Sequence, residues 1–191
     1  MNLRISEIIS ESIKVKQQLL EDKRLLNIIN DVADICTIAL KTNKKILLCG
    51  NGGSASDAQH IAAELTGRFY LNRDPFFAEA LHVNTSYLTA VANDYSFDEI
   101  YARQIQAKAE SGDILIAIST SGNSNNILRA IEQAKSQGVI VIGLAGLTGG
   151  KMKALVDYLI NIPSTDTPRI QEAHILVGHI ICELVEKYMV K

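Results

Sequence analysis

The stretch KILLCGNGGSASDAQHIAAEL, Lys45–Leu65, decides the fold class of this 191-residue chain. It begins with a short apolar run, passes through a glycine-rich turn and ends in residues with helical spacing. A strand that leads through such a turn into a helix is the repeating unit of an open α/β sheet, and ligands bind such sheets at the carboxyl ends of their strands. We therefore expect a ligand-binding turn at Gly50–Ser54.

Other short apolar runs follow along the chain, separated by helical stretches or polar turns. Near-continuous runs of Ile, Val and Leu are typical of strands that are buried on both faces of a parallel sheet. They predict an α/β fold with a mainly parallel sheet. The runs after the first are FFAEALHV, DILIAIS, VIVIGLA and DYLINI.

A second turn, Ser119–Ser124 (STSGNS), follows the run DILIAI. It offers the hydroxyls of Ser119, Thr120, Ser121 and Ser124, while Gly122 lets the backbone approach a ligand closely. With the free amides at the start of the next helix, these hydroxyls favour a site for a phosphate monoester. The alternative is a helix-capping turn, for which one serine would suffice. The helices after the two turns are predicted at 57–68 and 125–137.

The first turn also satisfies a loose dinucleotide fingerprint, G-x-G-x-x-A, at Gly50–Ala55. That fingerprint requires an acidic residue at the end of the second strand to bind a ribose hydroxyl. Here the second strand ends at Val83-Asn84, and neither turn contains the lysine of a P-loop. The sequence therefore disfavours a nicotinamide or flavin cofactor.

Apolar residues at helical spacing predict two amphipathic helices within the first forty residues and a long helix over 168–191. The first helix precedes the sheet and has no obvious surface to cover in its own chain. We therefore expect it to pack on another subunit.

Composition excludes several classes of function. The chain is 47% hydrophobic and 21% charged with a formal net charge of -2, which gives no sign of a nucleic-acid-binding surface. No run is long and apolar enough for a signal peptide or a membrane span. Cys36, Cys49 and Cys182 are widely spaced in apolar runs, as expected for buried free thiols in a reducing cytosol.

Two helical segments carry side chains suited to acid-base or metal chemistry. His60 and Glu64 are four residues apart and share one face of a helix. In the C-terminal helix, Gln171 and His179 lie about two turns apart on one side, whereas His174 falls among apolar positions and is a candidate core residue. As an acid and base over a pocket this set is better supported than as a metal site, since glutamine is an uncommon metal ligand.

Four segments in order, spanning nearly the whole chain, resemble the phosphoheptose isomerases of the sugar isomerase (SIS) fold family. They are CGNGGSASDAQHIAAELTGRF, LTAVANDYSFDEIYARQ, ISTSGNSNNILRAI and RIQEAHILVGHIICELVE. The resemblance implies one SIS domain over 1–191, with helices at 1–42 used in oligomer packing and an α/β core at 43–191. The implied fold is a flavodoxin-like three-layer sandwich with a five-stranded, mainly parallel sheet.

The resemblance also implies roles for individual residues. Glu64 and His179 would be the catalytic acid-base pair, and His60, Glu64, Gln171 and His179 would bind one Zn²⁺ per subunit. Whether that zinc is catalytic or structural stays open. The residues that would bind the substrate are Asn51, Gly52, Gly53, Glu64, Asn93, Asp94, Ser119, Thr120, Ser121, Ser124 and Gln171.

The implied reaction converts sedoheptulose 7-phosphate into D-glycero-D-manno-heptose 7-phosphate in the cytoplasm, toward activated heptose for lipopolysaccharide or other surface glycans. The implied assembly is a homotetramer with sites built between subunits, without nucleic acid or membrane partners. Many relatives have aspartate where Asn84 stands. The alternative within the fold family is a non-catalytic regulator that binds the replication initiator DnaA, a relative that lacks the residues matching Glu64 and His179.

Overall fold

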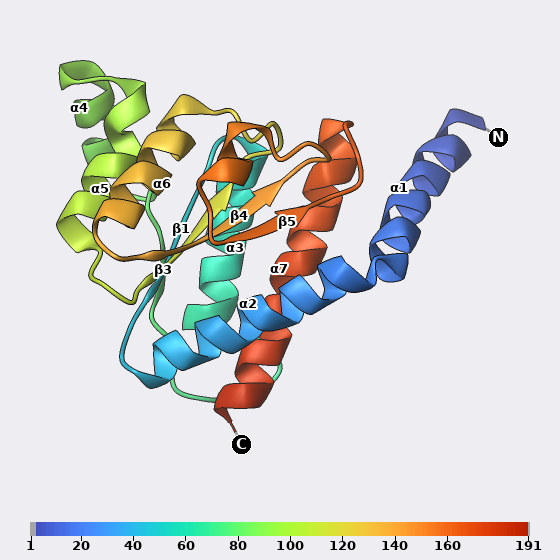
Figure 1. Cartoon of the computed structure of the whole chain (residues 1–191), viewed down its shortest axis with the longest axis horizontal. Helices are drawn as coiled ribbons and strands as arrows, with labels where there is room; N and C mark the ends of the chain where they lie inside the picture. Colours follow the sequence, from blue (N-terminus) through green and yellow to red (C-terminus); the bar gives the residue numbers. More distant parts are fainter. Residues whose placement is uncertain (1–2, 191) are drawn as a thin grey trace.

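The computed structural model describes residues 3–190 and has the alternating elements of an α/β protein (Figure 1). The strands are β1 (Ile46–Gly50), β2 (Ala78–Ala80), β3 (Ile114–Ile118), β4 (Ile140–Ala145) and β5 (Tyr158–Asn161). The helices are α1 (Leu3–Glu21), α2 (Lys23–Lys41), α3 (Gly53–Thr66), α4 (Thr85–Asp94), α5 (Ile100–Lys108), α6 (Asn125–Ser136) and α7 (Thr167–Met189), with short 3₁₀ turns η1 (Phe97–Glu99) and η2 (Gly150–Ala154).

The five strands form one sheet in the order β2-β1-β3-β4-β5, and every pairing in it is parallel. This is the flavodoxin-like doubly wound order, in which the switch point lies between β1 and β3. Ile46 accordingly pairs with Ala78 on one side and with Ile114 on the other. The two turns singled out in the sequence follow these adjacent strands, so both lie at the switch point.

Side chains of each strand alternate between two cores, one on each face of the sheet. Ile46 and Leu48 point into a core formed with α1, α2, α3 and α7. Leu47 and Cys49 point into a second core formed with α4, α5, α6 and η2. Each fully buried Leu or Ile contributes about 1.5–3 kcal/mol relative to an exposed one. The structure therefore confirms the predicted three-layer α/β sandwich.

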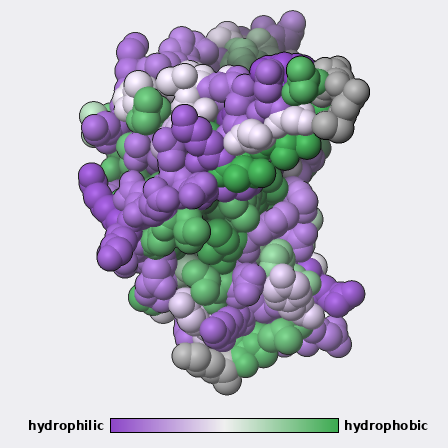
Figure 2. Space-filling model, turned by 90° about the vertical axis from the view of Figure 1, so that its right-hand side faces the viewer, coloured by the Kyte–Doolittle hydropathy of each residue, from purple (hydrophilic) through white to green (hydrophobic). Residues whose placement is uncertain are grey.

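The N-terminal region forms the two predicted helices. Asp22 begins α2, because its side chain accepts the backbone N–H of Leu25 at 3.0 Å. α1 projects from the body of the protein (Figure 1). On the side from which it projects, a hydrophobic area crosses the middle of the surface (Figure 2). The large apolar residues of α1 that are exposed are Leu3, Ile5, Ile8, Ile9, Ile13 and Leu20.

Two elements differ from the sequence prediction. α3 begins at Gly53 rather than at residue 57, because Gly52 adopts a positive φ of 56° and its carbonyl already accepts the N–H of Ala55. β2 covers only three residues of the predicted run FFAEALHV. It is an edge strand, and Phe76 turns instead toward the guanidinium of Arg73, 3.7 Å from the ring centroid.

Within residues 3–190, the structure confirms that the three cysteines are buried free thiols. Cys36, Cys49 and Cys182 are all buried and free, and burial raises the pKa of each thiol to about 12. They are therefore neutral and poorly nucleophilic at physiological pH. Among the described helices, none is long and apolar enough to cross a membrane.

His174 is a core residue of α7, fully buried, with its Nε2 3.2 Å from the carbonyl oxygen of Ala145. Its Nδ1 has no hydrogen-bond partner, so the ring is held as the neutral tautomer that donates from Nε2. Burial lowers the pKa of His174 to about 4. The unfolded chain, in which a histidine titrates near pH 6.5, therefore binds a proton before the folded protein does.

We expect the contribution of neutral His174 to the free energy of unfolding to be largest above pH 6.5 and to fall as the pH drops toward 4. From the pKa difference, the loss between pH 7.5 and pH 5 is about 2 kcal/mol. His174→Gln keeps an amide donor near the position of Nε2 and should remove this part of the pH dependence. Urea unfolding of both proteins at the two pH values measures it, and an equal acid loss in the variant would contradict the assignment.

Candidate active site at the α3–α7 contact

The contact between α3 and α7 holds the candidate catalytic residues. The two helices approach closely at Gly178, where an added Cβ would lie 2.5 Å from Cδ1 of the buried Ile61. A larger residue than glycine would therefore separate the helices or displace Ile61. α3 starts directly after β1, so this contact reaches the carboxyl edge of the sheet.

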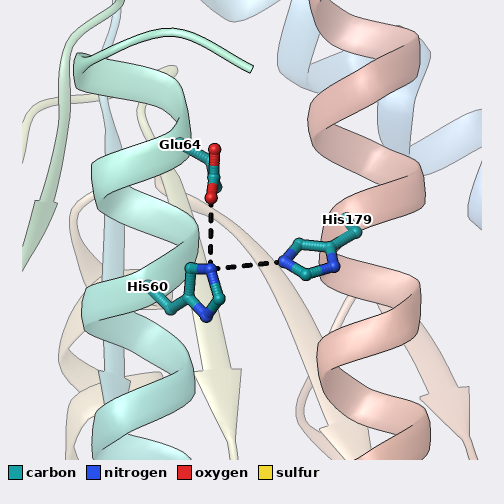
Figure 3. Close-up of side chains that lie close together, drawn as sticks. All are labelled: His60, Glu64 and His179. Atoms are coloured by element: carbon teal, nitrogen blue, oxygen red, sulfur yellow. Dashed lines mark hydrogen bonds and ion pairs between the residues drawn. The ribbon is translucent and has the colours of Figure 1, made fainter. Parts of the chain in front are cut away.

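His60, Glu64 and His179 meet across this contact (Figure 3). His60 Nε2 lies 3.1 Å from Glu64 Oε1 and 3.4 Å from His179 Nε2. The two imidazole rings meet edge to face, with centroids 4.9 Å apart. The structure therefore brings together three of the residues that the sequence singled out, from segments 119 residues apart in the chain.

The three side chains offer a donor set that suits a metal ion. One ligand atom from each of His60, Glu64 and His179 lies within 4.8 Å of the other two. Two imidazole nitrogens and a carboxylate oxygen are the ligands of a common catalytic zinc site, which keeps a further position for water or substrate. The side chain of His60 is 48% exposed and that of Glu64 26% exposed, so a ligand can reach them from solvent.

Gln171 lies at the opposite end of the same helix contact. A Cβ added to Gly53, the first residue of α3, would come within 2.4 Å of Gln171 Nε2. Glycine at this position therefore gives the Gln171 side chain its room beside the glycine-rich turn. The Gln171 amide thus lies next to a predicted sugar-binding residue.

The two turns at the switch point are joined by a pair of amides. Asn51 Nδ2 donates to Asn126 Oδ1 at 2.8 Å, and Asn126 Nδ2 donates to Asn51 Oδ1 at 2.8 Å. The phenol of Tyr101 donates to the carbonyl of Gly50 and anchors the first turn from the other face of the sheet. Asn51 and Gly52 are thereby held next to the start of α6.

The serine-rich turn is shaped by its own hydroxyls and by glycine. Ser119 Oγ lies 3.1 Å from Ser124 Oγ, and Ser121 Oγ accepts the N–H of Asn123 at 3.1 Å. Ser124 occupies the N-cap position of α6, yet its side chain makes no capping hydrogen bond. This geometry argues against the helix-capping alternative, because the hydroxyl that could cap the helix is used within the turn.

A cavity of about 290 Å³ adjoins this turn. Thr120 and Ser121 line it on one side. Further hydroxyls face it from Thr148, Ser164, Thr165 and Thr167. The amides at the start of α6 add the positive end of the helix dipole to the neighbouring turn. The hydroxyl-rich lining suits an anionic oxygen-bearing group.

Asn93 and Asp94 are not brought to the His60–Glu64–His179 group. They lie exposed at the end of α4, where Asn93 Nδ2 donates to Asp94 Oδ1 at 2.9 Å. α4 packs on the opposite face of the sheet from α7. Asn84 caps the start of the same helix by accepting the N–H of Tyr87 at 3.1 Å, a bond that aspartate would make equally well.

Several residues near the site were missed in the sequence. Asn126 follows the serine-rich turn on the buried side of α6 and is 2% exposed, and an asparagine within that apolar face was the available signal. Asp57 lies one turn before His60. It has one buried carboxylate oxygen without a partner, and burial raises its pKa. Arg73 and Glu186 form a buried ion pair beyond the C-terminal end of α3. No local sequence pattern predicted this pair.

Comparison of the chain with known proteins finds one family. The model of the SIS domain matches residues 9–146. The phosphoheptose isomerase of Aneurinibacillus thermoaerophilus is 52% identical over 98% of this chain and 94% of its own, and phosphoheptose isomerase 2 of Campylobacter jejuni is 51% identical over 98% and 93%. The solved phosphoheptose isomerase of Neisseria gonorrhoeae superposes with a TM-score of 0.91 at 42% identity, covering 96% of this chain and 97% of that one.

Proposed function

This chain belongs to the SIS domain family and, within it, to the phosphoheptose isomerases, and we propose that it converts sedoheptulose 7-phosphate into D-glycero-D-manno-heptose 7-phosphate. It is an isomerase that acts on a heptose phosphate. The observation that carries the finer proposal is that His60 joins Glu64 and His179 across the contact between α3 and α7, which starts at the glycine-rich turn. The relatives described above carry isomerase names and lend no support to a DnaA-binding regulator.

The proposed reaction moves hydrogen between neighbouring carbons of the open-chain sugar. Glu64 removes a proton from C1, the electron pair forms the C1–C2 double bond of an enediol, and the carbonyl oxygen at C2 takes up a proton. Glu64 then returns a proton to C2, while the hydroxyl at C1 loses its proton and becomes the aldehyde. His179 exchanges the protons at the two oxygens. A carboxylate and an imidazole in contact with one substrate are suited to these transfers.

Zinc held by His60, Glu64 and His179 is part of the proposal, whereas Gln171 lies at the other end of the helix contact and is not brought to these three. When bound, it would polarise the oxygens at C1 and C2 and join α3 to α7. A carboxylate that is tightly bound to a metal is a weaker base, so the role of Glu64 as the base requires weak ligation. Gln171, placed beside Gly53, is also positioned for the sugar hydroxyls.

The serine-rich turn is the proposed phosphate site. Ser119, Thr120, Ser121 and Ser124 would donate hydroxyl hydrogen bonds to the phosphate, aided by the start of α6. Asn51, Gly52 and Gly53 would contact the sugar between this turn and Glu64. Binding of the remote phosphate aligns the reacting end of the substrate, which is how such contacts accelerate a reaction.

We also propose a cytoplasmic homotetramer with sites shared between subunits. Two observations support it: the exposed apolar residues of α1, and the exposed position of Asn93 and Asp94 away from Glu64 in their own chain. In such an assembly these two residues would contact sugar bound to a neighbouring subunit. The product would feed the synthesis of activated heptose for surface glycans.

Conversion of purified substrate tests the proposed function. We expect NMR to show sedoheptulose 7-phosphate giving the aldose 7-phosphate, with solvent deuterium entering at C2 when the reaction runs in D₂O. Sedoheptulose without the phosphate is the matched control and should react far more slowly. Absence of conversion by zinc-loaded protein would contradict the proposal.

A further inference from the structure

The end of α3 that lies beyond Glu64 is fastened to α7 by a buried ion pair. Arg73 Nε lies 2.9 Å from Glu186 Oε1, and the two side chains are 4% and 2% exposed. Arg73 belongs to the connection between α3 and β2, residues 67–77, and this connection passes beside the C-terminal end of α7 (Figure 1). None of the roles assigned above uses either residue.

Arg73 contacts the backbone of the catalytic residue itself. Its Nη2 donates to the carbonyl oxygen of Glu64 at 3.0 Å, and its Nη1 donates to the carbonyl oxygen of Leu65 at 3.0 Å. α3 ends at Thr66, so these carbonyls lie in the last turn and lack partners within the helix. A guanidinium at this place satisfies them and also interacts favourably with the negative end of the helix dipole.

Glu186 holds the connection from the other side. Its carboxylate accepts the backbone N–H groups of Phe69, Tyr70 and Leu71 at 3.0, 2.7 and 2.9 Å, in addition to the bond from Arg73. Burial by itself would raise the pKa of Glu186, but these donors outweigh it and hold the pKa below the ordinary value. The carboxylate is therefore ionised and saturated with donors.

Phe69 links Glu186 to His179, the second catalytic residue. Its N–H is bound by Glu186, and its ring centroid lies 5.8 Å from that of the His179 imidazole. Glu186 and His179 are seven residues apart on α7, about two helical turns, and so lie on the same side of that helix. Arg73 therefore contacts Glu64 directly, at its carbonyl oxygen. Glu186 is linked to His179 through Phe69.

We propose that Arg73 and Glu186 are positioning residues, which set the spacing of Glu64 on α3 and His179 on α7 for catalysis and zinc binding. The inference rests on the proposed function of that site. Displacement of a reacting group by about 1 Å can cost about 100-fold in rate, and loss of a supporting contact typically costs about 10–100-fold in metal affinity or activity. The ion pair therefore acts through the two residues that it holds, and does not itself touch the substrate.

The test compares Glu186→Gln with a matched variant outside the contact between α3 and α7. Asp113 is also a fully buried carboxylate that accepts two backbone N–H groups, from Lys45 at 3.1 Å and Glu110 at 2.7 Å, and pairs with the Lys45 ammonium at 2.7 Å. It immediately precedes β3, and its bonds go to Lys45 and Glu110, neither of which belongs to α3, α7 or the connection at residues 67–77. Asp113→Asn should therefore lower the unfolding temperature without changing the site.

For Glu186→Gln we expect kcat to fall about tenfold with little change in KM, and the affinity for Zn²⁺, measured by competition with a chelating dye, to weaken about tenfold. Asp113→Asn, assayed at a temperature where both variants are folded, should match the wild type in both measurements. Wild-type kcat and Zn²⁺ affinity in Glu186→Gln, or an equal loss in Asp113→Asn, would overturn the inference.

A second variant keeps the test decisive if Glu186→Gln does not fold, since it leaves a buried guanidinium without its carboxylate. Arg73→Lys keeps the charge but cannot reach Glu186 and both carbonyls at once. We expect the same direction of change in kcat and Zn²⁺ affinity, and wild-type values for both would overturn the inference. Failure of the wild type to isomerise would instead remove the proposed function, while the Zn²⁺ measurement would still decide whether the ion pair shapes the site.

Discussion

Glu64→Gln is expected to reduce kcat for the heptose phosphate by about 100-fold to 10,000-fold, the range that a positioned general base contributes. In the wild type, His60 Nε2 lies 3.1 Å from Glu64 Oε1. Gln has the same size and keeps an oxygen that can accept a hydrogen bond from His60 Nε2. An amide cannot take up the proton from C1. The fold should be retained, because the Glu64 side chain is partly exposed and the stabilising bond from Arg73 goes to its backbone carbonyl.

The measurement is NMR of sugar conversion and of deuterium entry at C2, with the zinc content of each protein determined in parallel. Glu183→Gln is the matched control, since Glu183 is an exposed carboxylate on α7, four residues after His179. It should retain full activity. A Glu64→Gln protein that binds zinc and keeps kcat within about threefold of the wild type would rule out Glu64 as the base.

Gly122→Ala is expected to lower kcat/KM about 100-fold, mostly through a higher KM for the phosphorylated sugar. Gly122 has a φ of 65°, and an added Cβ would lie 2.1 Å from the carbonyl oxygen of Gly149. A side chain in the left-handed region costs about 1–2 kcal/mol, and a collision with backbone is not relieved by a rotamer change. The serine-rich turn must therefore shift, and each charge-assisted bond to phosphate that is lost costs about 1.5–3 kcal/mol.

Steady-state kinetics of Gly122→Ala and Gly138→Ala separate the local effect from general destabilisation. Gly138 also has a positive φ, 74°, but lies in the turn before β4, away from the site, and its added Cβ would meet the side chain of Ser111. Both variants should unfold at lower temperature, whereas only Gly122→Ala should raise KM. Equal KM values in the two variants would show that the turn does not bind the phosphate.

The sequence predicted the layers of the fold because they follow from local periodicity. Apolar runs of four to six residues have no solvated face, so they indicated strands of a parallel sheet, and the structure confirms five. Two boundaries were less predictable. α3 begins early because Gly52 has a positive φ and its carbonyl accepts the N–H of Ala55, and Phe76, just before the short edge strand β2, lies against the guanidinium of Arg73.

By itself, the sequence determined which chemical groups this protein has and on which elements they lie: a serine-rich turn after one strand, a histidine and a glutamate on one helix face, and a histidine on the last helix. Only the tertiary structure decided that these groups meet. The contact of His60 with His179, the amide pair of Asn51 and Asn126 and the ion pair of Arg73 and Glu186 join residues 119, 75 and 113 positions apart. Such contacts depend on how helices pack on a shared sheet, and packing is set by side chains far apart in the chain, so no local pattern encodes it.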